Sequence, residues 1–334
     1  MGAEIKYISK IEIKGLWGKF DLEWNLQPDV NVLSGINGSG KSTILNCVAT
    51  ILNNGLFNKN GHSRQIDELA KCIKYCRISY GIGGFLSYEY ANKTDKSQIE
   101  KLKKEFEKDK KEDGFEIFNQ AHDYYLNVKQ VKYLIGLDDF FEVNLISTFD
   151  NEFKPAEDIN KISDDNAKTE LDWEIYHLQK RYLKYKLSTA QKTIEAINKG
   201  ISNGKLLEIQ ANQDRFSDII DTLFEETHKK LNRKEDEISF LLGEEKISAY
   251  QLSSGEKQLL VILLTVLVQD NKNAILFMDE PEISLHFDWQ KKLIGYIREL
   301  NPNVQIILAT HSPAIIIEGW MDKVANVSDI IKLA

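Results

Sequence analysis

The chain has 334 residues, 28% charged and 42% hydrophobic, with a formal net charge of −8. The negative charge excludes a whole-protein basic field that attracts nucleic acid, and the absence of an apolar run of about 18 residues excludes a membrane-spanning helix. Cys47, Cys72 and Cys76 suggest neither a disulfide framework nor a zinc site, so we expect a globular cytoplasmic protein without a membrane partner.

The N-terminal part predicts two short strands and then a strand that leads into a glycine-rich loop. Residues 5–14 alternate apolar and polar side chains, which is typical of an edge strand, and residues 21–24 predict another short strand. The apolar run at residues 30–33 predicts a buried strand. The segment from Ser42 to about residue 53 predicts a helix.

Residues 35–42, between this strand and this helix, match the phosphate-loop pattern G-x-x-x-x-G-K-[ST] at every position. Glycines let successive N–H groups point at phosphate oxygens, and the helix start adds its positive dipole end. Lys41 is predicted to reach the β- and γ-phosphates, and the Ser42 hydroxyl to bind Mg²⁺. A glycine-rich turn that matched by chance would lack the flanking strand and helix. The predicted nucleotide-binding residues are Asn37, Gly38, Ser39, Gly40, Lys41, Ser42 and Thr43.

The middle of the chain predicts mixed helices and strands. Residues 64–75 predict a helix, on which Cys72 and Cys76 would lie four residues apart as buried thiols. Residues 76–90 predict two strands broken at glycines, and residues 141–149 predict another strand. A predicted helix at 97–112 interleaves lysines with glutamates, a pattern that favours a solvated face over a nucleic-acid patch.

Helices predicted at residues 165–198 and 211–230 indicate an antiparallel hairpin, because a loop with two glycines separates them. The first helix carries an apolar stripe spaced like a heptad repeat, formed by Leu171, Ile175, Leu178, Tyr182 and Tyr185. This stripe fits packing against the rest of the chain and fits a surface for a partner or a second copy equally well. Both alternatives stay open.

A strand predicted at residues 237–242 precedes the segment Leu-Ser-Ser-Gly-Glu-Lys-Gln at 252–258, which opens a strongly apolar helix. Serines and a glycine at a helix start offer hydroxyl and N–H groups to an anion. Because the phosphate loop already takes one nucleotide, this second anion site is predicted to serve the nucleotide of another molecule. The residues predicted to act in trans are Ser253, Ser254, Gly255 and Glu256.

Two apolar runs near the C-terminus, at residues 274–278 and 304–310, predict buried parallel strands. Asp279 and Glu280 follow the first run, at the strand end where open α/β sheets bind ligands. Asp279 is predicted to hold Mg²⁺, and Glu280 to accept a hydrogen bond from an attacking water. His311 follows the second run and could touch a γ-phosphate. Taken singly, the acids could end a strand before a turn, and the histidine could cap a helix.

In this order, the phosphate loop, the 252–258 segment, Asp-Glu-Pro-Glu at 279–282 and Thr-His-Ser at 310–312 resemble the motifs of ATP-binding-cassette (ABC) ATPases. The continuation Ile-Ser-Leu-His at 283–286 is similar to the SMC-like and OLD-like branch of that family. Within this branch the chain resembles ATPase components of bacterial anti-phage defence systems, namely PARIS, Septu and retron systems. The resemblance covers about residues 1–55 and 236–330.

The resemblance implies an α/β fold. This fold is an ABC-ATPase head, with a parallel sheet that carries the phosphate loop, an antiparallel β subdomain and a helical insertion with a short hairpin. Residues 1–150 would form the N-terminal part of the head, residues 151–235 the helical insertion, and residues 236–334 the C-terminal part of the head.

The resemblance also implies a head-to-tail dimer that binds ATP and Mg²⁺ between its subunits and hydrolyses the ATP. Lys41, Glu280 and His311 would be catalytic residues, and Ser42 and Asp279 would bind Mg²⁺. Ser284 would lie near the partner's site, in the segment called the D-loop.

One part of the family pattern is missing. Related cassettes carry a glutamine after the strand that corresponds to 141–149, and this glutamine contacts Mg²⁺ and the γ-phosphate. Here that strand ends Ser-Thr-Phe-Asp at 147–150, without a glutamine. Thr148 or Asp150 could take its place. For the adenine base, Trp17, Lys19 and Phe20 are candidate contacts because they follow the first strand.

OLD-type nucleases carry a nuclease domain after the head, and only 23 residues follow His311 here. We therefore expect a regulatory ATPase that controls a separate effector protein, such as a nuclease or a toxin. An alternative function is a DNA-clamping ATPase of repair or chromosome maintenance, with DNA as the partner. A second alternative is the nucleotide-binding subunit of a transporter, which the missing glutamine and the different signature segment argue against.

Overall fold

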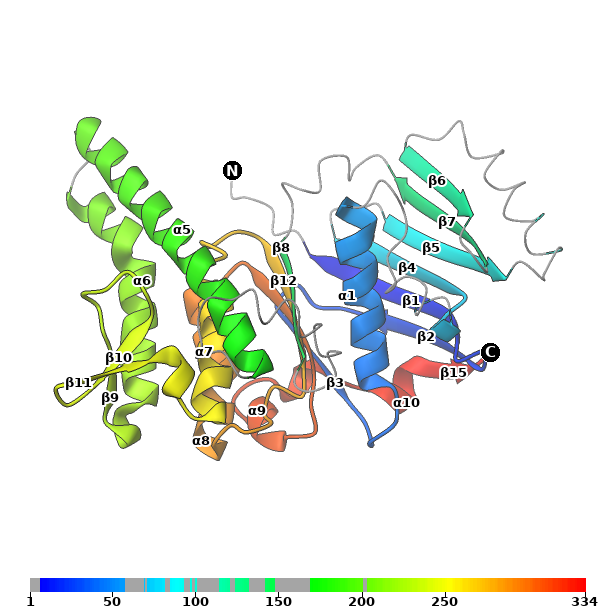
Figure 1. The fold of residues 1–334 in the computed structure, drawn as a ribbon. Coiled ribbons are helices and arrows are strands. Elements are labelled where there is room, and N and C mark those ends of the chain that lie inside the picture. Colours follow the sequence, from blue (N-terminus) through cyan, green and yellow to red (C-terminus); the bar gives the residue numbers. More distant parts are fainter. Residues whose placement is uncertain are drawn as a thin grey trace.

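This computed structural model describes residues 7–57, 69, 71–81, 85–92, 97, 100, 114–120, 124–131, 142–147, 169–200 and 203–334. These residues form the expected α/β fold, with one parallel sheet, one large antiparallel sheet and helices around the parallel sheet (Figure 1). The helix that follows the phosphate loop, α1 (Lys41–Phe57), lies between the two sheets (Figure 1).

Within the described residues, five parallel strands form the central sheet in the order β14-β3-β13-β12-β8. They are β3 (Val30–Ser34), β8 (Glu142–Ser147), β12 (Ala274–Asp279), β13 (Val304–Ala309) and β14 (Val324–Asn326). All residues of β12 and β13 are buried, as expected for apolar runs whose sheet is covered on both faces. The three strands predicted to carry the site are therefore neighbours.

Seven described strands form the antiparallel sheet in the order β15-β2-β1-β4-β5-β7-β6. They are β1 (Ile8–Leu16), β2 (Phe20–Asn25), β4 (Tyr75–Tyr80), β5 (Phe85–Asn92), β6 (Gly114–Gln120), β7 (Tyr124–Val131) and β15 (Ile331–Leu333). The expected strands at 5–14, 21–24 and within 76–90 are confirmed. The strands β6, β7 and β15 were not predicted from the sequence.

The two faces of the parallel sheet belong to two hydrophobic cores. One core joins α1 to the antiparallel sheet and includes Ile44, Val48, Ile275 and Phe277. The other core joins the opposite face to the helices of the second half of the chain. The start of α1 is thereby held on one face of the sheet. The helix that begins within the 252–258 segment is held on the other face (Figure 1).

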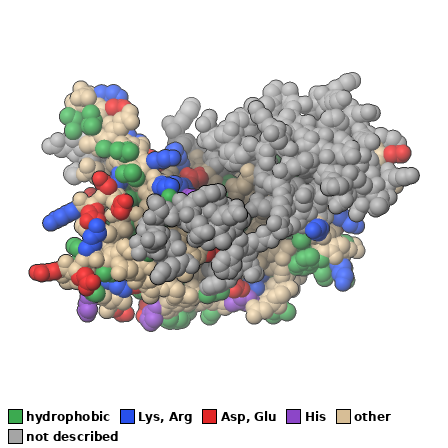
Figure 2. Space-filling model, in the orientation of Figure 1, with side chains coloured by type: hydrophobic (Ala, Val, Ile, Leu, Met, Phe, Trp, Pro, Cys, Tyr) green, Lys and Arg blue, Asp and Glu red, His purple; other side chains and the backbone are tan. Residues whose placement is uncertain are grey.

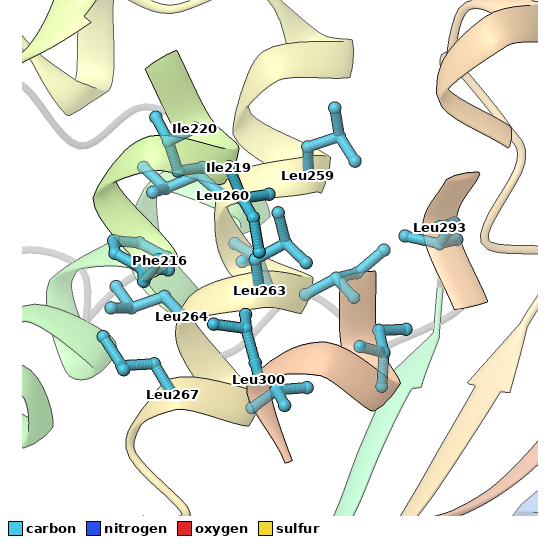
Figure 3. Packing of buried hydrophobic residues seen from close by; sticks show 14 of the residues in the cluster. Phe216, Ile219, Ile220, Leu259, Leu260, Leu263, Leu264, Leu267, Leu293 and Leu300 are labelled. Carbon is cyan, nitrogen blue, oxygen red and sulfur yellow. The ribbon is translucent and has the colours of Figure 1, made fainter. Parts of the chain in front are cut away.

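That helix, α7 (Ser254–Leu267), is apolar on all sides because other helices surround it. Its leucines contact α6 and α8 in the core (Figure 3). The remaining short elements of this half are α8 (Phe287–Leu300), α9 (Pro313–Ile317), α10 (Val327–Ile330), η3 (Glu225–Thr227), η4 (Ala249–Gln251) and η5 (Met321–Lys323).

The predicted hairpin is present as α5 (Glu170–Asn198) and α6 (Asn203–Leu223), which project away from the sheets (Figure 1). The helix α5 starts at Glu170 because Thr169 caps it through a capping box with Asp172. The second helix was predicted at 211–230, and both of its boundaries are wrong, since α6 begins at Asn203, includes Gly204 of the predicted loop and ends at Leu223. His228 adopts a φ of 55°, which ends helical geometry. The chain then enters a small sheet of β9 (Lys229–Leu231), β10 (Ser239–Leu242) and β11 (Glu245–Ser248).

The apolar stripe predicted on α5 packs against the chain's own helices. Ile175, Leu178, Tyr182 and Tyr185 are buried, and α5 contacts α7. Of the two alternatives, packing within the chain holds for these residues. Another face of α5 exposes apolar side chains near the hairpin tip, where hydrophobic atoms are visible at the surface (Figure 2). These exposed residues are Leu183, Leu187, Ile194 and Ile197.

The prediction that Cys72 and Cys76 share a helix is wrong. Cys76 lies in β4, where its side chain alternates into the core, and Cys72 precedes that strand. All three cysteines are free thiols, and burial raises the pKa of Cys47 to about 12.

Most of the residues in the helices predicted at 64–75 and 97–112 lie outside the described residues. Each helix in the described ranges is too short or too polar to cross a membrane.

Candidate functional site

The order of the parallel strands brings three predicted motifs to one edge of the sheet. The strand β13 lies between β3 and β12, so the loops after these strands are adjacent. The N–H of Thr310 donates to the carbonyl of Leu33 (3.2 Å), and the N–H of Glu280 donates to the carbonyl of Ala309 (2.8 Å). The phosphate loop, the Asp279–Glu280 pair and His311 are thus fastened to one another through backbone hydrogen bonds.

The phosphate loop has the backbone that its glycines allow. Gly38 and Gly40 have φ values of 77° and 96°, in the left-handed region where side chains are unfavourable. A Cβ at Gly40 would overlap the indole of Trp17, so this glycine is also required by close packing. Asn37, Gly38 and Ser42 are exposed. The loop is therefore open to a ligand on the side where α1 begins.

Lys41 is the first residue of α1, and its side chain lies back along the loop. Its Nζ donates to the carbonyls of Gly35 (3.2 Å) and Ile36 (3.3 Å) and lies 2.6 Å from Nε2 of His311. The ammonium group of Lys41 thus lies within hydrogen-bond distance of the imidazole of His311. Lys41 is only 4% exposed, so its positive charge is screened less by water than the charge of a surface lysine.

Glu280 adopts a φ of 48°, which is unfavourable for a residue with a Cβ. Such backbone strain persists where the surrounding structure holds it, and it concentrates at functional sites. Oε1 of Glu280 lies 3.3 Å from Nε2 of His311. Lys41, His311 and Glu280 therefore form one contiguous group, although 270 residues separate the first two in the sequence.

Asp279 and Ser42 form the neighbouring pair, joined by a side-chain hydrogen bond. Burial raises the pKa of the Asp279 carboxyl above its usual value, and the nearby Glu280 and Glu282 add to this, whereas Ser42 and Lys41 oppose it. A carboxylate and a hydroxyl side by side are oxygen ligands that suit Mg²⁺. A divalent cation would also relieve the repulsion among the three acids. The residues present therefore fit the Mg²⁺ that the resemblance implies.

The 252–258 segment places two serines at the surface. Ser253 is the N-cap of α7, and its hydroxyl accepts a hydrogen bond from the N–H of Glu256. Ser253 and Ser254 are exposed, whereas Gly255 is buried. A Cβ at Gly255 would overlap the carbonyl oxygen of Ser284. The signature segment thus packs directly on the loop that follows Asp279 and Glu280.

Glu256 was predicted to act in trans, but its side chain is only 1% exposed. Its carboxylate accepts hydrogen bonds from Nζ of Lys229 (2.7 and 2.8 Å), from the hydroxyl of Thr227 (2.9 Å) and from the N–H and hydroxyl of Ser253. These donors surround the carboxylate within its own chain. We therefore correct its role to holding the serines in place, because a buried carboxylate cannot reach another molecule.

A second buried ion pair joins the same helix start to the hairpin. Nζ of Lys257 lies 2.7 Å from Oδ1 of Asp172, the capping-box residue at the start of α5. Lys229 belongs to β9, which follows the end of α6. The start of α7 is therefore connected through ion pairs to both ends of the hairpin.

Replacing Lys229 with Met is expected to destabilise the protein by about 3–5 kcal/mol, because it leaves the Glu256 carboxylate buried without its cation. Urea denaturation at pH 7 measures this loss. The double variant Lys229→Met/Glu256→Leu should recover much of it, since both charges are then removed. Equal stability of Lys229→Met and the wild type contradicts the assigned pairing.

The same pair predicts a pH dependence. Burial raises the pKa of Glu256, but the hydrogen bonds from Lys229, Ser253 and Thr227 outweigh burial and hold this pKa below its usual value of 4.5. A lowered pKa contributes stability that is complete above pH 4.5 and is lost as the pH falls through the folded-state pKa. Glutamine does not titrate, so the free energy of unfolding of Glu256→Gln should fall less than that of the wild type as the pH is lowered below 4.5.

Two expectations concern residues near the site. Thr148 and Asp150, the suggested replacements for the missing glutamine, lie outside the described residues. Ser147, just before them, pairs in register with Asp279, so this strand ends at the same sheet edge as the site. Of the candidate adenine contacts, Trp17 is 39% exposed beside Gly40, and Phe20 packs edge-on against its ring.

The structure also shows residues that sequence reasoning did not assign. Glu282, Gln290 and Ser312 form a hydrogen-bonded group behind His311. The sequence signal for Glu282 was its position as a third acid next to Asp279 and Glu280. Its hydrogen-bond partners, however, lie about thirty residues away, and only the order of the strands in the sheet brings them close.

Comparison with known protein families gives a match over residues 30–318 to the family described as "AAA domain, putative AbiEii toxin, Type IV TA system". The chain belongs to this family. The match spans the phosphate loop, the signature segment, the Asp-Glu-Pro-Glu segment and His311, which are the motifs that meet in the fold.

Proteins with similar sequences include "Septu protein PtuA" of Bacillus thuringiensis. It is 26% identical over 346 residues, covering 98% of this chain and 75% of the relative. "Retron Vc95 probable ATPase" of Vibrio cholerae serotype O1 biovar El Tor is 22% identical, covering 91% of this chain and 70% of the relative. These relatives confirm the resemblance to Septu and retron ATPases that the motifs indicated. A solved Smc head bound to the C-winged helix domain of ScpA aligns with 98% of this AAA-domain chain and 97% of its own, at 18% identity and a TM-score of 0.49.

Proposed function

We propose that this protein binds ATP with Mg²⁺ and hydrolyses it to ADP and phosphate. The observation that carries this proposal is the contact of Lys41 with His311 and of His311 with Glu280, beside the Ser42–Asp279 pair. In phosphoryl transfer, a positioned acceptor for the water and positive charge on the phosphates supply most of the catalysis. All of these groups lie at one sheet edge.

Each residue has a distinct task in this proposal. Glu280 accepts a hydrogen bond and then the proton from the water whose oxygen attacks the γ-phosphorus, while the bond from that phosphorus to the bridging oxygen of ADP breaks. Lys41 moves from His311 to the phosphates and stabilises their negative charge, and His311 contacts the γ-phosphate. Bound Mg²⁺, held by Ser42 and Asp279, would neutralise charge on the β- and γ-phosphates.

We further propose that two copies pair head-to-tail, so that Ser254 of one copy contacts the nucleotide held by the phosphate loop of the other. Three features support this pairing. Ser253 and Ser254 are exposed, α1 and α7 lie on opposite faces of the sheet, and Gly255 packs on Ser284 beside the acids. A γ-phosphate between two surfaces adds charge-assisted hydrogen bonds to pairing, and hydrolysis removes them.

Replacing Ser254 with Arg tests the pairing. Arg is too large for a closely packed nucleotide interface, so we expect ATP binding within about threefold of the wild-type value but no ATP-dependent dimer. Light scattering after gel filtration, with Mg²⁺ and a non-hydrolysable ATP analogue, measures the mass. The exposed Ser328, on α10, gives the matched control Ser328→Arg, which should still pair. A dimer of normal stability in Ser254→Arg would contradict the proposal.

The nucleotide-controlled pairing is proposed to regulate a separate effector protein in anti-phage defence. The support for this step is the resemblance to Septu and retron ATPases. Native mass spectrometry of the chain co-expressed with the product of its neighbouring gene tests it. A stable complex whose composition changes between ATP and ADP is expected, and the same composition in both states contradicts it.

A further inference from the structure

The carboxylate of Glu282 collects three donors from the segment that carries His311. Its Oε1 accepts hydrogen bonds from the hydroxyl of Thr310 (2.6 Å), from the N–H of His311 (2.8 Å) and from the N–H of Ser312 (3.1 Å). A carboxylate has only acceptors and makes shorter, stronger hydrogen bonds than a neutral oxygen. One oxygen therefore holds three consecutive residues of the loop after β13.

A second link runs parallel to this one. The hydroxyl of Ser312 donates to the side-chain oxygen of Gln290 (2.6 Å), and the side-chain amide of Gln290 donates to the carbonyl of Leu285 (2.9 Å). Leu285 in turn donates its N–H to the carbonyl of Glu282 (2.9 Å). The loop after β12 and the loop after β13 are thus joined twice, directly through Glu282 and again through α8.

The position of the His311 ring depends on this backbone. Its Nε2 lies close to both Lys41, at the start of α1, and Glu280, in the loop after β12. The three donors bound by Glu282 include the His311 N–H itself, so the carboxylate restricts the Cα from which the ring projects. A displacement of about 1 Å at a reacting group can reduce a rate by ~10²-fold.

We propose that Glu282 is a positioning residue, which acts through the backbone of His311 to hold its imidazole between Lys41 and Glu280. This inference rests on the proposed ATPase function. Glu282 itself touches neither nucleotide nor water in this scheme. In this scheme Asp279 binds the metal and Glu280 binds the water. Glu282 keeps His311, which contacts the γ-phosphate, aligned with these two residues.

Capping of α9 alone does not explain Glu282. Ser312 already caps that helix, since its hydroxyl accepts a hydrogen bond from the N–H of Ala314 (3.2 Å). The second oxygen of Glu282 is buried and has no hydrogen-bond partner among the described residues. The bonds from Thr310 and from the His311 N–H lie before the start of α9, so capping this helix does not require them.

Replacing Glu282 with Ala tests the inference through the split between kcat and KM for ATP. We expect kcat to fall by about 10²-fold, while KM changes by less than roughly threefold, because the phosphate loop is untouched. Glu282→Gln keeps an acceptor for the three donors and should recover most of kcat. Combining Glu282→Ala with His311→Ala should lower kcat little beyond His311→Ala alone, because the two residues act as one unit.

A second measurement needs no ATP. In the ¹⁵N-labelled protein, the ring resonances of His311 at fixed pH should move in Glu282→Ala and stay near their wild-type place in Glu282→Gln. Glu299→Ala, an exposed acid of α8, is the matched control and should leave rate and resonances unchanged. If Glu282→Ala does not fold, Thr310→Val removes one of the three donors, and a smaller shift of the same resonances and a partial loss of kcat are expected.

The outcomes separate this inference from the proposed function. An inactive wild type contradicts the ATPase proposal, and the resonances still report on the position of the ring. With an active wild type, normal kcat in a folded Glu282→Ala overturns the positioning role alone. Additive losses in the double variant, or unmoved His311 resonances, overturn it as well.

Discussion

A Glu280→Gln variant is expected to bind ATP and Mg²⁺ with nearly normal affinity but to hydrolyse ATP at least ~10²-fold more slowly, the usual contribution of a positioned base. Glutamine has almost the same shape, and the backbone hydrogen bond from residue 280 to Ala309 is kept, so the loop should not move. The amide, however, cannot accept the proton of the attacking water. The paired state should therefore persist in ATP, because the γ-phosphate is not removed.

Phosphate release measures the rate, and light scattering in ATP and Mg²⁺ measures the persistence of the dimer. Glu299→Gln, on the exposed side of α8, serves as the control for loss of a negative charge. Hydrolysis by Glu280→Gln near the wild-type rate would falsify the role assigned to Glu280. A variant that is inactive but never pairs would instead contradict the proposed link between nucleotide state and assembly.

The Lys41→Ala variant is expected to lose at least ~10²-fold in affinity for ATP. In the proposed function the buried ammonium donates hydrogen bonds to two phosphates, and hydrogen bonds to charged groups each contribute about 1.5–3 kcal/mol. Its present partners are two backbone carbonyls and the imidazole of His311, and none of them is a phosphate anion. Exchanging them for phosphate oxygens is therefore favourable, and alanine removes this gain.

Calorimetric titration with ATP and Mg²⁺ measures the affinity directly. Lys246→Ala is a suitable control, because Lys246 is exposed and paired with Glu235 far from the phosphate loop. A thermal unfolding curve like that of the wild type should accompany the lost binding. Unchanged affinity in Lys41→Ala would show that the loop does not hold the nucleotide in the predicted way.

Those parts of the fold that depend on contiguous residues could be predicted from the sequence. The strands β3, β12 and β13 are unbroken apolar runs, and α7 is an apolar run of helical length after a capping serine. The phosphate loop is equally local, since its glycines and the start of α1 determine where the N–H groups point. Each of these motifs was located correctly.

Elements that depend on pairing with distant residues were missed or misplaced. The strands β6 and β7 were missed although apolar and polar residues alternate in parts of both, and β15 is only three residues long. The strand β9 occupies residues expected in a helix because β10 pairs with it. The stripe on α5 illustrates the same difficulty. Its heptad spacing was recognised, but which molecule covers it depended on where α7 lies.

The candidate site shows both kinds of information. The chain order of the motifs indicated the family, and the family match confirms it. The contacts that hold His311 through Glu282, and the burial of Glu256 by Lys229, involve residues about thirty positions apart in sequence. No local pattern specifies such contacts, since each depends on which strands are neighbours in the sheet.

The sequence by itself determined where the phosphate-loop pattern, the signature segment and the buried strands lie, because these depend on short-range backbone geometry and on apolar runs. Only the tertiary structure decided which acids face the ligand side and which hold neighbouring segments in place. That distinction depends on burial and hydrogen-bond partners, and these are created when β13 inserts between β3 and β12.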